Sequence, residues 1–89
     1  MVERVVTIQN KLGLHARAAA LFVQTASRYA AEVTLEKDGV EVNGKSIMGL
    51  MMLAAAKGCD VVLRADGDDE HVAIDGMARL IADKFNEEA

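Results

Sequence analysis

The segment Gly13-Leu14-His15-Ala16-Arg17 combines residue types that together can carry phosphoryl chemistry. Neither proline nor glycine occurs in residues 16–31, so we expect a helix to begin directly after His15, with Gly13 supplying the bend before it. The start of a helix presents unpaired N–H groups and a partial positive charge, which favour anions and phosphate above all. A nucleophilic imidazole, a helix start and the Arg17 guanidinium therefore indicate a small phosphoryl-holding site. A histidine that merely caps the helix fits the same residues equally well.

A histidine that carries a phosphoryl group must meet definite chemical requirements. An unperturbed imidazole titrates near ~6.5, so at neutral pH one ring nitrogen has a free lone pair that can attack phosphorus. The product is negatively charged, and the N–H groups of the first helical turn and Arg17 can stabilise that charge. A carrier must also give the group away again, so we expect a shallow, exposed site that stabilises it only moderately.

Other residues offer little chemistry. His71 follows Glu70 at a predicted helix start and has no nucleophile, base or metal-ligand partner nearby in sequence, so we expect a solvated helix residue. Cys59 is the single cysteine, cannot form an internal disulfide, and is expected to be a small, partly buried residue at a strand entrance. Because no metal-ligand spacing, nucleotide loop or catalytic pairing stands out, we expect no metal, no cofactor and no enzymatic activity of its own.

Length and charge restrict the class of protein further. The chain fits one domain, residues 1–89, and a net charge of -4 without any tryptophan argues against nucleic acid as a partner. The N-terminal residues lack the basic and apolar regions of a signal peptide, and no apolar run approaches the ~20 residues of a membrane span. We therefore expect a monomeric cytoplasmic protein that neither binds nucleic acid nor inserts directly into a membrane.

Hydrophobic patterning predicts seven elements in the order βαββαβα. Alternating residues and an Asp38-Gly39 turn predict strands, and apolar residues three and four apart predict helices. The strands are expected at residues 2–8, 32–37, 40–42 and 61–65, and the helices at 16–28, 47–53 and 70–85, with 86–89 fraying. The predicted fold class is α+β, an open-faced sandwich in which two long helices and one short helix cover one face of a four-stranded, largely antiparallel sheet.

The long helices have apolar stripes that should pack on the sheet. The stripes are Ala19, Phe22, Val23 and Ala26 in the first helix, and Ala73, Ile74, Met77, Leu80 and Ile81 in the last. A second face of the first helix is mostly small and includes Ala16 and Ala20. Small side chains beside a reactive histidine would let a partner protein approach closely, although alanine is also simply a good helix former.

The short helix is predicted to begin after Ser46, a natural N-cap. Residues at core-facing spacing are Ile47, Leu50 and Leu53. Met48 and Met51 would share a second face that stays partly exposed, and unbranched methionine is common on surfaces that bind several partners. Spacing leaves open whether all of these apolar residues are buried instead.

Two motifs in this sequence resemble a known family. Gly13-Leu14-His15-Ala16-Arg17-x-Ala19 together with Lys45-Ser46-Ile47-Met48-Gly49 resembles HPr, the histidine-containing phosphocarriers of the bacterial phosphoenolpyruvate-dependent sugar phosphotransferase system. The resemblance covers nearly the whole chain, including the order of its elements. It implies that enzyme I phosphorylates His15 on Nδ1, that enzyme IIA domains receive the phosphoryl group for sugar uptake, and that Arg17 stabilises the phosphohistidine.

The resemblance also implies a docking surface and a switch. The expected partner-binding residues are Ala16, Ala20, Ile47, Met48 and Met51. Ser46 corresponds to the serine that an ATP-dependent HPr kinase/phosphorylase phosphorylates in many bacteria. A phosphate at Ser46 adds roughly two negative charges at a helix N-terminus, which would stabilise the helix and weaken docking of an acidic partner.

The sequence departs from the family at Ala18, where members usually have proline. Proline lacks an N–H and fixes φ, so Ala18 should leave one more donor facing the site and a slightly looser first turn. The residues leave two other functions open: a regulatory module that binds partners through phosphorylated Ser46, and a small-ligand-binding α+β domain. Whether a carrier would serve sugar uptake or a nitrogen-related branch stays open as well.

Overall fold

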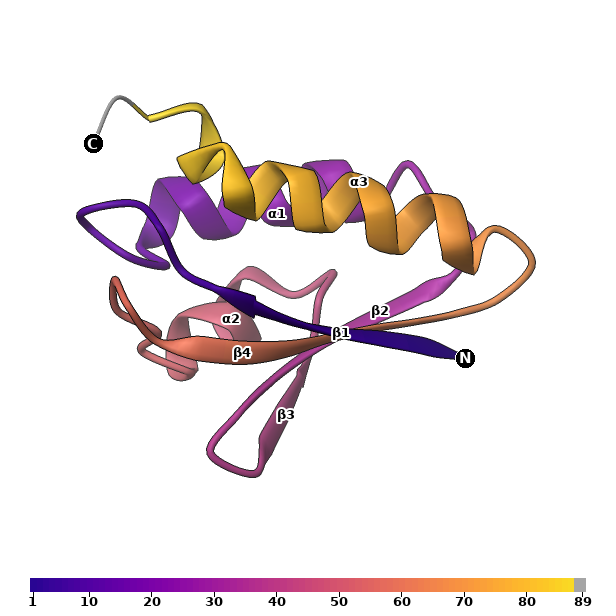
Figure 1. The fold of residues 1–89 in the computed structure, drawn as a ribbon, viewed down its shortest axis with the longest axis horizontal. Helices are drawn as coiled ribbons and strands as arrows, with labels where there is room; N and C mark the ends of the chain where they lie inside the picture. Colours follow the sequence, from indigo (N-terminus) through magenta and orange to yellow (C-terminus); the bar gives the residue numbers. More distant parts are fainter. Residues whose placement is uncertain (88–89) are drawn as a thin grey trace.

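The chain folds into four strands and three helices, followed by a short 3-10 turn (Figure 1). The computed structural model describes residues 1–87. The elements are β1 (Val2–Thr7), α1 (Ala16–Ala26), β2 (Glu32–Lys37), β3 (Val40–Asn43), α2 (Ile47–Met52), β4 (Asp60–Asp66), α3 (Glu70–Ala82) and η1 (Lys84–Asn86). Their order confirms the predicted βαββαβα arrangement. None of the helices within the described residues is long and apolar enough to cross a membrane.

All strand pairs in the sheet are antiparallel. The strand order is β1-β4-β2-β3, with Val6 opposite Val61 and Leu35 opposite Leu63. The hairpin between β2 and β3 has Asp38 and Gly39 as its two turn residues, with φ values of 52° and 83°. Positive φ at both positions is the geometry that a two-residue hairpin with the native strand twist requires, which explains why this dipeptide predicted the turn.

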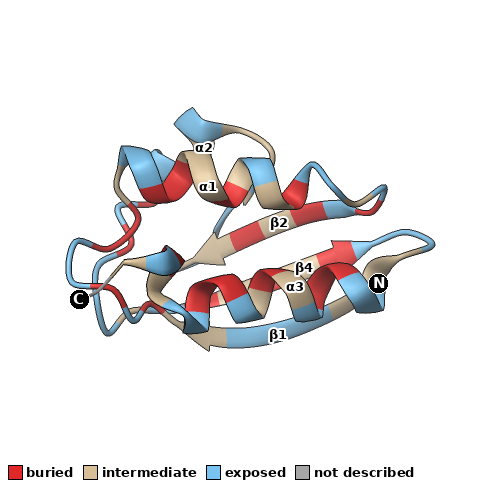
Figure 2. Ribbon diagram, turned by 90° about the horizontal axis from the view of Figure 1, so that it is seen from above, coloured by how far each residue is buried: buried red, intermediate tan, exposed pale blue. Residues whose placement is uncertain are grey.

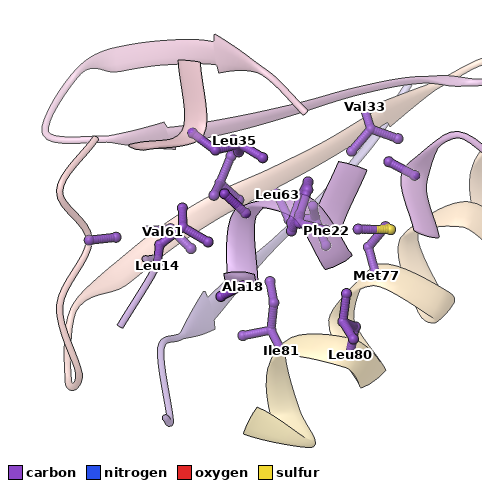
Figure 3. Packing of buried hydrophobic residues seen from close by; sticks show 14 of the residues in the cluster. Leu14, Ala18, Phe22, Val33, Leu35, Val61, Leu63, Met77, Leu80 and Ile81 are labelled. Atoms are coloured by element: carbon purple, nitrogen blue, oxygen red, sulfur yellow. The ribbon is translucent and has the colours of Figure 1, made fainter. Parts of the chain in front are cut away.

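The core lies between the sheet and the long helices. Figure 2 shows buried and exposed residues alternating around α1 and α3, as expected for helices with one face against a sheet. Figure 3 shows Val33, Leu35, Val61 and Leu63 of the sheet near Phe22 of α1 and Met77, Leu80 and Ile81 of α3. The stripe predicted for α3 is fully buried, whereas Val23 of the α1 stripe is only half-buried. Ala18 and Leu14, next to the candidate site, also belong to the core.

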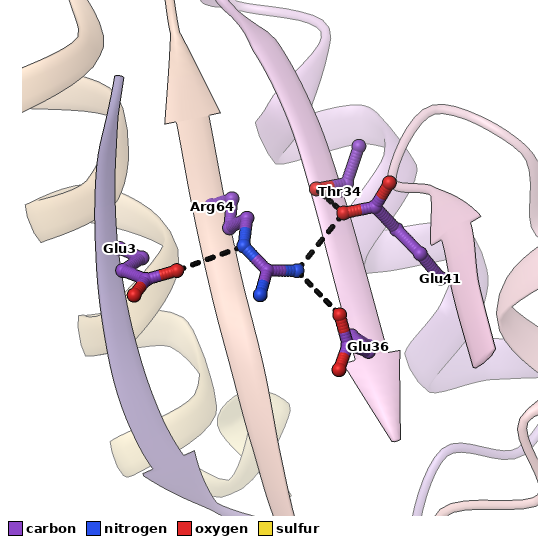
Figure 4. Close-up of polar contacts among 5 residues, drawn as sticks. All are labelled: Glu3, Thr34, Glu36, Glu41 and Arg64. Atoms are coloured by element: carbon purple, nitrogen blue, oxygen red, sulfur yellow. Dashed lines mark hydrogen bonds and ion pairs between the residues drawn. The ribbon is translucent and has the colours of Figure 1, made fainter. Parts of the chain in front are cut away.

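The face of the sheet opposite the helices carries a charged network around Arg64 (Figure 4). Its guanidinium donates to Glu3 of β1 at 2.8 Å, to Glu36 of β2 at 2.7 Å and to Glu41 of β3 at 2.9 Å. The hydrogen bond to Glu36, followed by the one to Glu3, raises the pKa of Arg64 above its ordinary value. One arginine on β4 therefore connects all four strands on the face that the helices leave uncovered.

The helix ends differ from the prediction. α1 ends at Ala26 and α3 at Ala82, two and three residues earlier than the predicted residues 28 and 85. After α3 the chain reverses through Lys84, Phe85 and Asn86, all with positive φ, and Phe85 is buried. The prediction that residues 86–89 fray is wrong for Asn86 and Glu87, because Glu87 is hydrogen-bonded to the body of the domain. Residues 88–89 lie outside the described part of the chain.

Candidate functional site

His15 is the N-cap residue of α1, but its side chain does not cap the helix. Its backbone is extended, with φ −83° and ψ −179°, and its carbonyl oxygen accepts the first bond of the helix from Ala19 N at 2.8 Å. The imidazole makes no capping hydrogen bond. The simple capping role that the sequence left open is therefore not what this side chain does.

The loop before α1 holds His15 against the rest of the domain. Gly13 has φ +67°, and its carbonyl accepts a hydrogen bond from the buried Asn10 Nδ2 at 2.6 Å. Leu14 is buried, and its N–H donates to the carbonyl of Ala55 at 2.9 Å. His15 follows directly, so its backbone is fixed by the loop after α2 as well as by its own helix.

The first turn of α1 presents free N–H groups beside the imidazole. The amides of Ala16, Arg17 and Ala18 have no hydrogen-bond partner among residues 1–87, and the turn contains no acidic residue. Unpaired N–H groups at a helix start are the usual ligands of phosphate oxygens. Alanine at position 18 therefore retains the third of these donors, which proline would remove.

Arg17 is exposed and lies two residues after His15. Within residues 1–87 its guanidinium takes part in no ion pair or hydrogen bond, so it is available to an anion. Its positive charge makes a small contribution to lowering the pKa of the Glu87 carboxyl.

Glu87 and Asn10 complete the site, and sequence reasoning missed both. Glu87 Oε2 lies 2.5 Å from Nε2 of His15, while Oε1 accepts from Asn10 Nδ2 at 2.8 Å. The Asn10 hydrogen bond, with help from His15 and against the effect of burial, holds the pKa of Glu87 below its ordinary value of 4.5. A loop asparagine and a glutamate two residues before Ala89 carry no sequence signal that would associate them with His15.

A patch of exposed apolar side chains on α2 lies beside α1. Met48 is 77% exposed and Met51 is 45% exposed, as the resemblance implied. Ile47 is 42% exposed, which also agrees with the resemblance; the core-facing position that its spacing allowed is not taken, because this six-residue helix buries only Leu50. Met52 is 78% exposed and extends the patch, although its spacing did not single it out. We call Ile47, Met48, Met51 and Met52 the α2 patch.

The small face of α1 flanks the histidine. Ala16 is exposed and Ala20 is half-buried, so the surface next to His15 carries little side-chain bulk. α2 packs against α1, so the helix that carries the α2 patch adjoins the helix that carries this small face.

Ser46 is the N-cap of α2, as predicted. Its backbone is extended, with φ −123° and ψ 114°, and Oγ accepts a hydrogen bond from Gly49 N at 3.1 Å. The half-buried side chain therefore lies at the start of the helix that carries the α2 patch.

The structure also describes the histidine and the cysteine that the sequence analysis set aside. His71 is exposed on α3, and Cys59 is half-buried and unpaired, both as expected. Within residues 1–87, no three histidine, cysteine, aspartate or glutamate side chains lie close enough together to hold a metal ion.

The fold is a small open-faced sandwich. Its candidate site contains a histidine at a helix start whose side chain does not cap the helix. The family described as "PTS HPr component phosphorylation site" matches residues 2–83. The phosphocarrier protein HPr of Xylella fastidiosa (strain Temecula1) is 50% identical over 88 residues, covering 99% of both chains. The chain therefore belongs to the HPr family of phosphocarriers.

Solved structures support the same assignment. The crystal structure of HPr-C-His from Thermoanaerobacter tengcongensis matches with a TM-score of 0.95 at 53% identity, covering all of both chains. A second crystal structure from that organism, described as an HPr dimer, matches with a TM-score of 0.78 at 53% identity, covering 98% of this chain and 100% of the other. The fold of the family is thus reproduced over the full chain.

Proposed function

We propose that this chain is a phosphoryl carrier: His15 accepts a phosphoryl group on Nδ1 from phospho-enzyme I and passes it to enzyme IIA domains for sugar uptake. The observation that supports this most strongly is that the His15 imidazole makes no capping hydrogen bond and lies next to three unpaired helix N–H groups. The partner proteins supply the catalysis, so the chain is transiently phosphorylated and is not itself an enzyme.

Each site residue has a distinct role in the proposed transfer. The Nδ1 lone pair attacks phosphorus, the bond from phosphorus to the donor's leaving atom breaks, and its electron pair remains with the donor. The free N–H groups of Ala16, Arg17 and Ala18 and the Arg17 guanidinium stabilise the phosphoryl oxygens. Because Arg17 is exposed, its attraction for the phosphoryl group is weakened by water and salt, and the group can still be delivered.

Partner proteins dock on the α2 patch together with Ala16 and Ala20. Methionine side chains are flexible and polarisable, which suits a surface that must fit both a donor and several acceptors. The small α1 face lets those partners bring their own reactive group close to His15. A carrier with one shared surface binds donor and acceptor in turn. We expect it to act as a monomeric cytoplasmic domain. Light scattering in solution measures its molecular mass, and a stable dimer would contradict the expected monomer.

Ser46 is proposed as a regulatory site for HPr kinase/phosphorylase. Its Oγ already accepts the Gly49 N–H, so a phosphate there would strengthen an existing N-cap while placing negative charge beside the α2 patch. Docking of acidic partner surfaces would then weaken while the helix itself remains intact.

The carrier function is tested by incubation with enzyme I and phosphoenolpyruvate. Wild type should form an acid-labile, base-stable adduct, and His15→Ala should form none. His71→Ala provides the matched control, because His71 is an exposed histidine on another helix and should leave the adduct unchanged. An adduct that persists in His15→Ala would sink the proposal.

A further inference from the structure

The chain after α3 turns back onto the candidate site. Lys84, Phe85 and Asn86 have φ values of 58°, 54° and 61°, a left-handed turn that successive L-residues rarely adopt. Phe85 belongs to the buried core and anchors this turn. The turn thereby brings the Glu87 carboxylate to His15, although 72 residues separate the two in sequence.

Asn10 fixes the position of the Glu87 carboxylate. The Asn10 side chain is fully buried, and Nδ2 donates one hydrogen to the Gly13 carbonyl and the other to Glu87 Oε1. Its Oδ1 has no hydrogen-bond partner among residues 1–87, which costs free energy for a buried acceptor. The reverse amide orientation would set Oδ1 against two acceptor oxygens, so Gly13 and Glu87 together determine how Asn10 lies.

We infer that Glu87 is a positioning residue that holds the His15 ring with its proton on Nε2 and its lone pair on Nδ1. The inference rests on the proposed function, because it explains why Nδ1 is the nitrogen that accepts the phosphoryl group. A carboxylate 2.5 Å from Nε2 accepts a hydrogen bond from that nitrogen and selects the Nε2–H tautomer of the neutral ring. Among residues 1–87, Nδ1 has no hydrogen-bond partner and stays free to attack.

The same contact serves both directions of transfer. When Nδ1 bonds to phosphorus, the ring becomes a cation while the Nε2 proton stays in place, and the Glu87 carboxylate offsets the new charge. On delivery the Nδ1–P bond breaks, its electron pair returns to Nδ1, and the neutral ring is recovered without any proton transfer. The ring lies between the carboxylate and the phosphoryl group, so attraction to the adjacent imidazolium outweighs the more distant repulsion.

The first test measures the ¹⁵N chemical shifts of the His15 ring nitrogens in the unphosphorylated protein, at a pH at which the ring is neutral. These shifts show which of the two nitrogens carries the proton. Wild type should show one tautomer, with the proton on Nε2. Glu87→Ala removes the contact and Glu87→Asp withdraws the carboxylate by one methylene while keeping its charge, so both should give tautomer mixtures. Asp83→Asn removes an exposed carboxylate of the same segment and should leave the single tautomer. Identical tautomer populations in wild type and Glu87→Ala would overturn the inference.

The second test measures phosphoryl transfer from phospho-enzyme I. Loss of a charge-assisted hydrogen bond at a partly exposed site should slow Glu87→Ala by about threefold to tenfold, while Asp83→Asn keeps the wild-type rate. An equal or faster rate in Glu87→Ala would contradict the role of Glu87. Because the tautomer measurement needs no phosphoryl donor, a single Nε2–H tautomer in a protein that accepts no phosphoryl group would refute the carrier function and leave the contact standing.

Discussion

The carbonyl oxygen of Ala55 accepts the N–H of Leu14 at 2.9 Å and lies 2.5 Å from the point that a Cβ on Gly13 would occupy. The loop before α1 and the loop after α2 are therefore in such close contact that only glycine fits at position 13. The positive φ of Gly13 adds a second, conformational reason for glycine there. This contact fixes the start of α1, and with it His15, relative to the helix that carries the α2 patch.

Gly13→Ala should destabilise the domain more than a glycine substitution that faces only the conformational cost. Gly39→Ala is the matched control, because Gly39 has φ +83° and open space around its Cβ position. We expect a loss of about 1 kcal/mol for Gly39→Ala from the positive φ, and about 2–4 kcal/mol for Gly13→Ala, where overlap with Ala55 adds to it. Urea unfolding measures both values, and equal losses would show that the close contact is unimportant.

Ala18→Pro should remove one hydrogen-bond donor to the phosphoryl group and stabilise the fold. Proline removes the free N–H at position 18 and restricts the unfolded chain, so the free energy of unfolding should rise by about 0.4–1 kcal/mol. The phosphohistidine should lose one donor and hydrolyse about twofold to fivefold faster at neutral pH. An adduct with the wild-type lifetime would mean that the Ala18 N–H does not contact the phosphoryl group.

Ser46 variants can separate helix capping from charge. Ser46→Ala should lose about 1 kcal/mol of stability with its N-cap, whereas aspartate and asparagine are comparable caps and should retain it. Ser46→Asp places a negative charge next to Met48 and Met51, so transfer from enzyme I should need a several-fold higher carrier concentration to reach half its maximal rate. Ser46→Asn has nearly the same shape without the charge and should behave as wild type. The same impairment in both variants would exclude an electrostatic switch.

Asp69, at the start of α3, gives the domain a pH-dependent contact outside the candidate site. Its carboxylate accepts the N–H groups of Ala30 at 2.9 Å and Ala31 at 2.8 Å, tying the start of α3 to the chain before β2. The Ala30 hydrogen bond is the largest cause that lowers the pKa of Asp69 from its ordinary value of 3.8, with smaller contributions from Ala31 and the charge of Lys45. A pKa that is lower in the folded than in the unfolded state stabilises the fold above the ordinary value, and this contribution is lost as the pH falls through the folded pKa.

Asp69→Ala should therefore lower the urea midpoint at pH 6, and its difference from wild type should shrink as the pH falls below about 4. Asp68→Ala is the control, because Asp68 is an exposed neighbour without a hydrogen bond among residues 1–87. It should match wild type across the same range. A constant gap between wild type and Asp69→Ala at every pH would show that the ionised carboxylate is not what stabilises the fold.

Local signals predicted most of the fold. The Asp38-Gly39 pair, the α3 stripe and the Ser46 cap each depend on residues close in sequence, and each is present as expected. His15 could also be placed at a helix start, because the glycine before it and the uninterrupted run after it are local features.

The errors lie where distant segments meet. The contact between Glu87 and His15 depends on how the end of α3 turns and on the burial of Phe85, which no local pattern near residue 87 indicates. Ile47 has the spacing of a core residue, but a helix of six residues has room to bury little more than Leu50. Tertiary packing determines both the contact of Glu87 and the exposure of Ile47. The spacing of apolar residues along the chain predicts only which face of a helix or strand is apolar.

The central claim is that the phosphoryl group bonds to Nδ1 of His15. ³¹P and ¹⁵N NMR of the phosphorylated protein, with histidine nitrogens labelled, tests this most directly through the one-bond coupling between phosphorus and nitrogen. We predict a single phosphohistidine whose phosphorus couples to Nδ1 of His15, with His71 unmodified. Coupling to Nε2, phosphorus on His71, or no phosphohistidine at all would contradict it.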